Sequence, residues 1–211
     1  MKEILLQYYA KQNLGDDLFV SILSDHFSDC KINLLSNPAY VPKALGANVS
    51  VHPFSIVRSV LGKLQSLIGW NHPITHKLEA WQRATLDRII SRNDAFVFIG
   101  GSIFLQRGAK NQEVDFLTDR KPVFTYSSQH QTSGKSFIIG ANLGPIYTKE
   151  FLASIKSTLT GYAHVTLRDY SSYCLVNDLS HVQYAPDVIF MAQQPPVTTA
   201  EKSVVISVID I

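Results

Sequence analysis

Short apolar segments alternate along the chain with longer amphipathic stretches. The short segments are typical of buried strands, and they are Glu3–Tyr9, Lys31–Leu35, Ala95–Ile99, Pro122–Tyr126, Ser136–Ala141, His164–Leu167 and Val182–Ala185. The longer stretches, in which apolar residues recur near the helical period, predict helices: from Asp16 or Asp17 to about Phe27, over Pro53–Ile68, Thr75–Arg92 and Tyr147–Leu159, and from about Asp169 onward. This alternation favours an α/β fold in which helices cover both faces of a parallel sheet.

Two further assignments follow from the same pattern. Ser36–His52 is predicted to be a loop, because prolines and a glycine interrupt it. Trp70 and Trp81 are predicted to lie in the core, as large aromatic residues usually do.

The length of the chain suggests one domain, or one domain and part of a second. At about 150 residues per domain, 211 residues correspond to about 1.4 domains. Residues 1–190 hold all the alternating strands and helices, and residues 191–202, with Pro195-Pro196, have the composition of a linker. Residues 203–211 form one more apolar segment, which we expect to be the first strand of a truncated second domain.

Composition excludes several classes of protein. With 45% hydrophobic and 17% charged residues and a net charge of +2, the chain is neither disordered nor suited to nucleic acid as its main partner. We expect Cys30 and Cys174 to be reduced thiols. The seven histidines are scattered, so no metal is predicted. No signal peptide or transmembrane segment is recognisable, which predicts a cytoplasmic protein and leaves room for peripheral contact with a membrane.

The candidate chemistry lies where predicted strands end. Small, polar or charged residues follow five strands, and they are Asn13-Leu14-Gly15-Asp16-Asp17, Gly100-Gly101-Ser102, Asn142-Leu143-Gly144-Pro145, Arg168-Asp169 with Ser171-Ser172, and Pro186-Asp187. The carboxyl ends of parallel strands meet at one edge of a sheet, where ligands of α/β proteins bind. Glycines there let backbone N–H groups approach an anion. Arg168 offers a bidentate fork to a carboxylate or phosphate, and Asp16 is a candidate general base.

Each of these residues also has a structural interpretation. A Gly-Gly pair after a strand is often only a turn, and Asp16, Asp17 and Asp169 are typical helix caps. Arg168 and Asp169 could form a local ion pair, and Pro186-Asp187 could simply end a strand. Agreement across five strand ends is what favours a binding site over these separate explanations.

The ordered set of motifs resembles the polysaccharide pyruvyl transferase family. The resemblance rests on Asn13-x-Gly15-Asp16, Gly100-Gly101-Ser102-Ile103-Phe104, Gly140-Ala141-Asn142-Leu143-Gly144-Pro145, Arg168-Asp169-x-x-Ser172 and Pro186-Asp187, and it extends over residues 1–211.

The resemblance implies the N-terminal half of a two-domain, GT-B-like fold built from Rossmann-like halves. It implies transfer of a pyruvyl group from phosphoenolpyruvate, without a cofactor, to a sugar hydroxyl of a cell-surface polysaccharide or exopolysaccharide. Arg168 would hold the phosphate or carboxylate of the donor, and the glycine loops and Asn142 would line the cleft. The residues expected to bind substrate are Asn13, Gly15, Gly100, Gly101, Ser102, Asn142, Gly144, Arg168, Ser172 and Asp187, with Asp16 as the catalytic candidate.

Two alternatives remain open from the sequence. One is a GT-B-type glycosyltransferase that uses a nucleotide sugar. The other is a non-catalytic, truncated remnant of a transferase.

Overall fold

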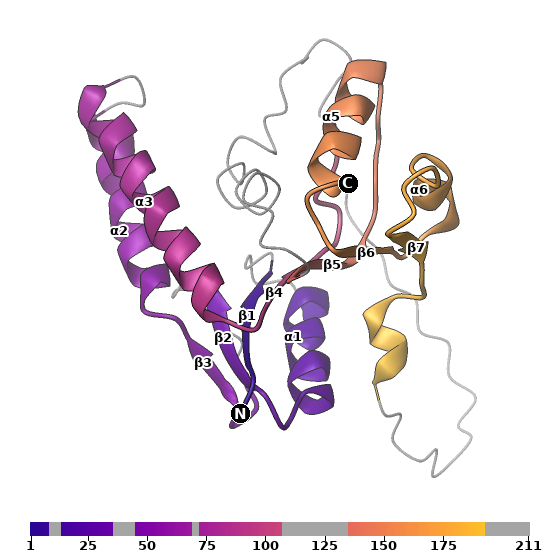
Figure 1. Cartoon of the computed structure of the whole chain (residues 1–211), viewed down its shortest axis with the longest axis horizontal. Helices are drawn as coiled ribbons and strands as arrows, with labels where there is room; N and C mark the ends of the chain where they lie inside the picture. The colour runs from indigo at the N-terminus through magenta and orange to yellow at the C-terminus, as the bar shows by residue number, and fades with distance from the viewer. Residues whose placement is uncertain (9–13, 36–44, 69–71, 107–134, 193–211) are drawn as a thin grey trace.

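The structure is a computed structural model that describes residues 1–8, 14–35, 45–68, 72–106 and 135–192. In this part of the chain one seven-stranded sheet has the order β3-β2-β1-β4-β5-β6-β7, and all neighbouring strands are parallel (Figure 1). The strands are β1 (Glu3–Gln7), β2 (Lys31–Leu35), β3 (Val49–Val51), β4 (Ala95–Ile99), β5 (Ser136–Ala141), β6 (His164–Leu167) and β7 (Val182–Tyr184).

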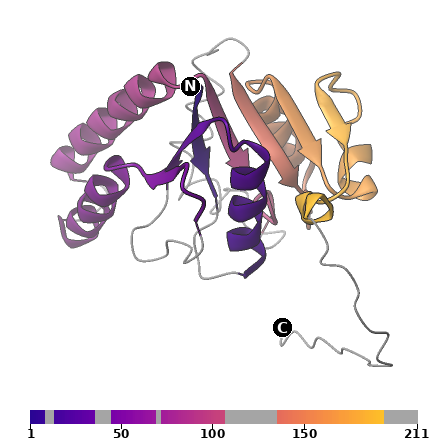
Figure 2. The same cartoon turned by 90° about the horizontal axis from the view of Figure 1, so that it is seen from below.

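Helices cover both faces of this sheet (Figure 1). Helix α1 (Leu14–His26) and the 3-10 helix η2 (Val188–Met191) lie on one face and contact each other. The helices α2 (Phe54–Ile68), α3 (Pro73–Arg92), α5 (Lys149–Leu159) and α6 (Tyr170–Cys174) lie on the other side. Figure 2 shows α2 and α3 side by side at the β3 edge.

Strand β4 shows why the sheet is buried on both sides. Phe96 and Phe98 belong to the hydrophobic cluster that includes side chains of α3 and α5. Val97 and Ile99 belong to the other cluster, which includes side chains of α1. Because successive side chains of a strand point to opposite faces, a continuous apolar segment fills both cores.

The strand order locates the point where a ligand is expected. The chain builds the sheet outward from β1 to β3, returns to β4 beside β1, and then builds outward to β7. The direction in which the chain adds strands to the sheet therefore reverses between β1 and β4. Doubly wound sheets bind ligands at the carboxyl ends of the strands beside such a reversal, or switch point. This is a Rossmann-like α/β fold, as the pattern of strands and helices predicted.

Most predicted elements are confirmed, four strands with their predicted bounds: Lys31–Leu35, Ala95–Ile99, Ser136–Ala141 and His164–Leu167. The prediction of a loop over Ser36–His52 is wrong at Val49–Val51, because this short edge strand pairs with β2 alone.

Two other predictions are wrong in detail. Helix α1 begins at Leu14, so Asp16 and Asp17 lie within its first turn and do not cap it. Trp81 is 49% exposed and is not a core residue. The predicted strand at Pro122–Tyr126 and the predicted strand at 203–211 lie outside the described residues, as does nearly all of the 191–202 linker. The division into domains therefore stays a prediction.

Candidate functional site

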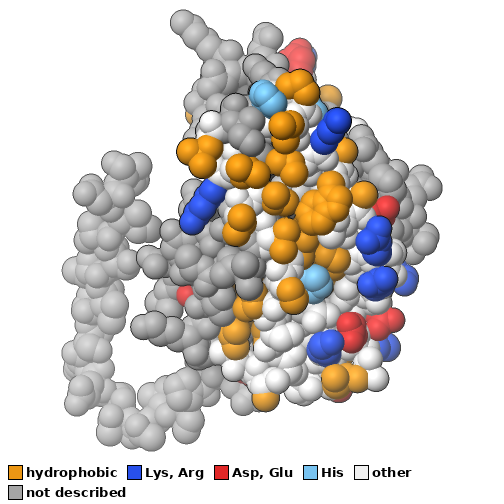
Figure 3. Space-filling view, turned by 90° about the vertical axis from the view of Figure 1, so that its left-hand side faces the viewer, with side chains coloured by type: hydrophobic (Ala, Val, Ile, Leu, Met, Phe, Trp, Pro, Cys, Tyr) orange, Lys and Arg blue, Asp and Glu red, His pale blue; other side chains and the backbone are white. Residues whose placement is uncertain are grey.

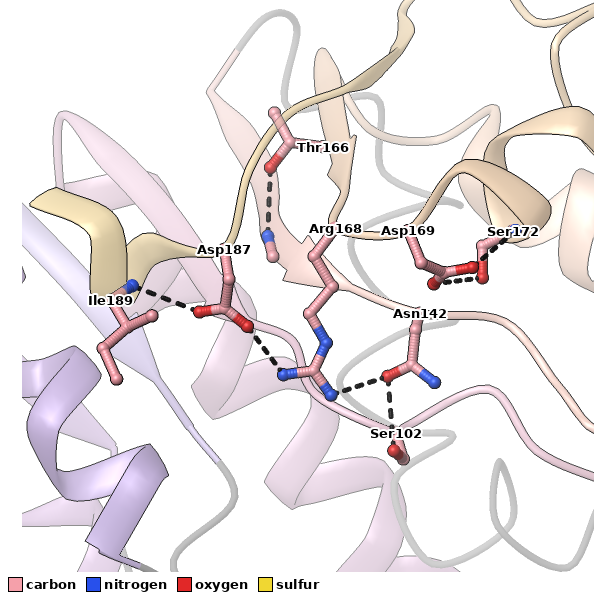
Figure 4. A network of polar contacts seen from close by, with 9 residues as sticks. Ser102, Asn142, Thr166, Arg168, Asp169, Ser172, Asp187 and Ile189 are labelled. Carbon is pink, nitrogen blue, oxygen red and sulfur yellow. Dashed lines mark hydrogen bonds and ion pairs between the residues drawn. The ribbon is translucent and has the colours of Figure 1, made fainter. Parts of the chain in front are cut away.

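Arg168 is the centre of a polar network at the carboxyl ends of four strands (Figure 4). It follows β6 directly, and its Nη1 donates to Asp187 Oδ2 over 2.9 Å, while its Nη2 donates to Asn142 Oδ1 over 3.0 Å. Ser102 Oγ donates to the same Asn142 oxygen over 3.2 Å. The network therefore joins residues that follow β4, β5, β6 and β7, as the parallel sheet predicted.

The ion pair fixes the guanidinium without using all of its donors. The side chains of Arg168 and Asp187 are 29% and 21% exposed. Asp187 Oδ1 accepts from the backbone N–H of Ile189 over 3.1 Å and so caps η2. Both oxygens of Asp187 are thus occupied. Arg168 has five N–H donors, and its contacts with the described residues use two of them.

Asn142 offers a second donor at this edge. Its Oδ1 accepts from both Ser102 and Arg168, which fixes the orientation of the side-chain amide. The Nδ2 group has no partner among the described residues and is directed away from both contacts in Figure 4. An anion at the edge of the sheet therefore meets N–H donors from two different strands.

The glycines of the neighbouring loops are required by the backbone itself. Gly100 N–H donates to Ile139 O over 2.7 Å, and Gly144 N–H donates to Phe104 O over 2.8 Å. These two N–H groups are occupied within the fold and are not available to an anion. Gly101 and Gly144 have φ of 121° and 108°, a region that side chains disfavour.

Ser172 and Asp169 support the loop that carries Asn142. Ser172 is 1% exposed, and its hydroxyl accepts from the N–H of Leu143 over 2.7 Å and lies 2.6 Å from Asp169 Oδ2. Asp169 is the N-cap of α6 and accepts from Ser172 N–H over 2.8 Å. Burial raises the pKa of Asp169, but the hydrogen bonds from Ser172 and Ser171 outweigh it, so the pKa lies below its ordinary value. Asp169 is therefore a cap and does not pair with Arg168.

The remaining predicted residues, Asn13, Gly15 and Asp16, come just before or at the start of α1 in the sequence. Asn13 is outside the described residues, and Gly15 and Asp16 lie in the first turn of α1, on the side of the sheet where β1 ends. The side chain of Asp16 is also outside the described part, so its catalytic role stays a prediction. Burial raises the pKa of the neighbouring Asp17 carboxyl. Raised carboxyl pKa values are common where a carboxyl group takes part in proton transfer.

Two residues at or near the candidate site, Gln7 and Thr166, were not predicted from the sequence. Gln7 ends β1 at the switch point, is 6% exposed, and its Oε1 is a buried oxygen without a hydrogen-bond partner among the described residues. The signal available was a polar residue directly after the three apolar residues of this strand. Thr166 Oγ1 accepts from Gly140 N–H over 3.0 Å and supports the strand that leads to Asn142. That role depends on pairing between β5 and β6, which the sequence does not show.

Neither a metal centre nor a membrane span is found in the described residues. No group of three or more His, Cys, Asp or Glu side chains there could hold a metal ion. No described helix is both long enough and apolar enough to cross a membrane.

The fold and the site together define a class of protein. It is a doubly wound α/β fold with an ordered arginine, Arg168, at the carboxyl ends of its parallel strands, which is the edge where such folds bind ligands. The family model for polysaccharide pyruvyl transferases matches residues 13–211, so the chain belongs to that family. A search of curated proteins finds no match to the chain.

Proposed function

We propose that this chain binds phosphoenolpyruvate at the network of Ser102, Asn142, Arg168 and Asp187 and takes part in transfer of its pyruvyl group to a sugar. Membership of the family supports transfer of a pyruvyl group in general. The observation that carries the choice of donor is Arg168, which is held by two contacts that use only two of its five N–H donors.

The chemistry of phosphoenolpyruvate fits this arrangement. The molecule carries a phosphate and a carboxylate close together, and one guanidinium can bind either through two parallel N–H groups. We propose Asn142 Nδ2 as the donor to a second oxygen. Fixed donors stabilise developing charge without having to reorganise during the reaction. The ordering of Arg168 by Asp187 therefore favours both binding and reaction.

The proposed reaction balances without a cofactor. A proton adds to the methylene carbon of phosphoenolpyruvate, and a sugar hydroxyl attacks the resulting oxocarbenium-like carbon. A second hydroxyl of the same sugar then displaces the phosphate and completes the ketal. Of the two hydroxyl protons, one balances the new methyl group and the other leaves with the phosphate. Asp16 and Asp17, in the first turn of α1, are the candidates for proton transfer.

Calorimetry with phosphoenolpyruvate tests the proposal. Arg168→Gln removes the charged donors, and we expect about 10- to 100-fold weaker binding, since a hydrogen bond to a charged group contributes about 1.5–3 kcal/mol. Asp187→Asn keeps the shape of the side chain and removes the competing negative charge, so binding should be retained. Lys156→Gln is the control, because Lys156 lies on α5 and its ion pair with Asp178 is away from this edge.

Three results would overturn the proposal. One is equal affinity for phosphoenolpyruvate in the Arg168→Gln variant and the unchanged chain. Another is unfolding of Arg168→Gln by circular dichroism, which would make Arg168 a structural residue. Binding of a nucleotide sugar but not of phosphoenolpyruvate would favour the glycosyltransferase alternative.

A further inference from the structure

The outward face of α2 carries an apolar stripe. Val57, Val60, Leu64 and Leu67 are 40%, 60%, 40% and 84% exposed. They follow one another at intervals of three, four and three residues, so they lie along one side of the helix. Single exposed apolar residues are common on protein surfaces, but a continuous stripe marks a surface that contacts something else.

Helix α3 widens this stripe into a patch. Ile74 and Trp81, seven residues apart on α3, are each 49% exposed. Figure 3 views the side on which α2 and α3 lie, and it shows hydrophobic side chains gathered down the middle of this face, with Lys and Arg side chains beside them. We call these six residues, Val57, Val60, Leu64, Leu67, Ile74 and Trp81, the apolar patch.

The segment that carries the patch is strongly basic. Residues 53–92 contain six Lys and Arg and two Asp and Glu, a net charge of +4. The whole chain has a net charge of +2, so the other residues together carry −2. Lys63 and Lys77 are exposed on α2 and α3, the two helices that carry the patch. The positive charge of this protein is thus concentrated beside its exposed apolar surface.

We propose that α2 and α3 bind the surface of an anionic lipid bilayer through the apolar patch and the basic residues beside it. Amphipathic helices with Lys and Arg beside large apolar side chains lie in the membrane interface, held by apolar burial and by attraction to anionic lipids. This inference goes beyond the proposed reaction and does not depend on it.

The charges and the apolar side chains together favour a lipid surface over other occupants. A second copy seated face to face on the same patch would bring two surfaces of +4 together, which is unfavourable. Nucleic acid would use the basic residues but not the apolar stripe on α2. A bilayer with anionic headgroups uses both. No described helix can cross a membrane, so the helices would lie along the surface.

Sedimentation with lipid vesicles tests the proposal. Vesicles of phosphatidylglycerol and phosphatidylcholine in equal parts should bind the protein at least about tenfold better than phosphatidylcholine alone, and salt should weaken this binding. The double variant Val60→Gln/Leu67→Gln should reduce binding about tenfold or more, because it removes apolar area from the interface. Its control is Leu175→Gln, at an apolar residue that is 39% exposed at the end of α6.

A matched pair of charge variants separates the patch from overall charge. Lys63→Glu/Lys77→Glu reverses two charges beside the patch, and Lys135→Glu/Lys149→Glu makes the same change in net charge at exposed positions near β5 and α5. We expect only the first pair to reduce binding at least about tenfold. Equal effects of the two pairs would mean that net charge alone drives binding, and the proposal would be wrong.

Tryptophan fluorescence reports on the patch itself. The two tryptophans of the chain are Trp70 and Trp81, so Trp70→Phe leaves Trp81 as the only reporter. Its emission should shift to shorter wavelength on anionic vesicles and be quenched by brominated lipid. No change with vesicles would refute the proposal. A shift that depends on protein concentration without vesicles would identify a second copy as the occupant and would also refute it.

Discussion

Gly100→Ala tests how tightly the end of β4 is packed against β5. A Cβ atom at residue 100 would lie 2.4 Å from both N and Cα of Ala141, whereas ordinary contacts of a Cβ atom lie at 3.4–4 Å. The atoms in the way are backbone, so no side chain can rotate to make room. Either the two strands separate by about 1 Å or the backbone of residue 100 distorts. Ala141→Gly would not relieve the overlap, because the two closest contacts are not with its side chain.

The expected change in the free energy of unfolding is the difference between two opposing contributions. Overpacking costs about 3 kcal/mol at the upper end of the usual range. Alanine restricts the unfolded chain more than glycine does, which offsets about 0.5–1 kcal/mol of this cost. The free energy of unfolding should therefore fall by about 2 kcal/mol. Asn142 follows Ala141 directly, so the same displacement should weaken its 3.0 Å contact with Arg168.

Gly62→Ala is the matched control. Gly62 lies within α2, and a Cβ atom added there meets nothing within 4 Å. Alanine should stabilise the helix at this position by about 0.5–1 kcal/mol. In urea, with a slope of about 2 kcal/mol per M, the unfolding midpoints of the two variants should differ by about 1.5 M. Coincident midpoints would show that the backbone at residue 100 adapts freely, and the packing explanation for this glycine would fail.

Two further predictions concern the loops that support the site. Gln106→Ala should lower the free energy of unfolding by about 2 kcal/mol, because the backbone N–H groups of Tyr147 and Thr148 lose their shared acceptor; chemical denaturation measures this, and an unchanged midpoint would contradict it. The pKa of Asp169 is lower in the folded state than in the unfolded chain. Its carboxylate therefore stabilises the fold at pH values above the unfolded pKa, and this stabilisation is lost as the pH falls through the folded pKa. Asp169→Asn should therefore flatten the dependence of unfolding free energy on acid pH below about 4, and a titration that matches the unchanged chain would show that Ser172 does not stabilise the carboxylate.

The sequence predicts an element of the fold well where its hydrophobic pattern fits only one kind of structure. The continuous apolar segment Ala95–Ile99 is a strand whose alternate side chains are buried in the two hydrophobic cores. Polar residues are excluded from the whole segment, so its ends can be predicted from the sequence. Val49–Val51 lacks such a signal, because a three-residue edge strand owes its conformation to pairing with β2. The prediction that Trp81 is buried rested on the size of its side chain and was wrong, because nothing in the described structure covers α3 at that residue.

The site was predicted in outline through topology. Parallel strands bring their carboxyl ends together, so Ser102, Asn142, Arg168 and Asp187 could be expected at one edge before any distance was known. The individual pairings could not be derived in this way. Arg168 has Asp169 as its neighbour in sequence, yet it pairs with Asp187, because the N–H of Ser172 and the hydroxyls of Ser171 and Ser172 hold the Asp169 carboxylate. Local hydrogen bonds compete with ion pairs for the same oxygens.

The Arg168–Asp187 pair has consequences that separate binding from folding. Both side chains are partly exposed, and ion pairs in that situation contribute little to stability, about 0–1 kcal/mol. Loss of Arg168 should therefore leave the fold intact. The same pair holds the guanidinium in one position, so a ligand need not order that side chain on binding. An anion can bind to N–H groups that the described contacts leave unused, without displacing Asp187. It follows that Asp187→Asn, which leaves Arg168 charged and removes a competing carboxylate, should affect donor binding far less than Arg168→Gln does.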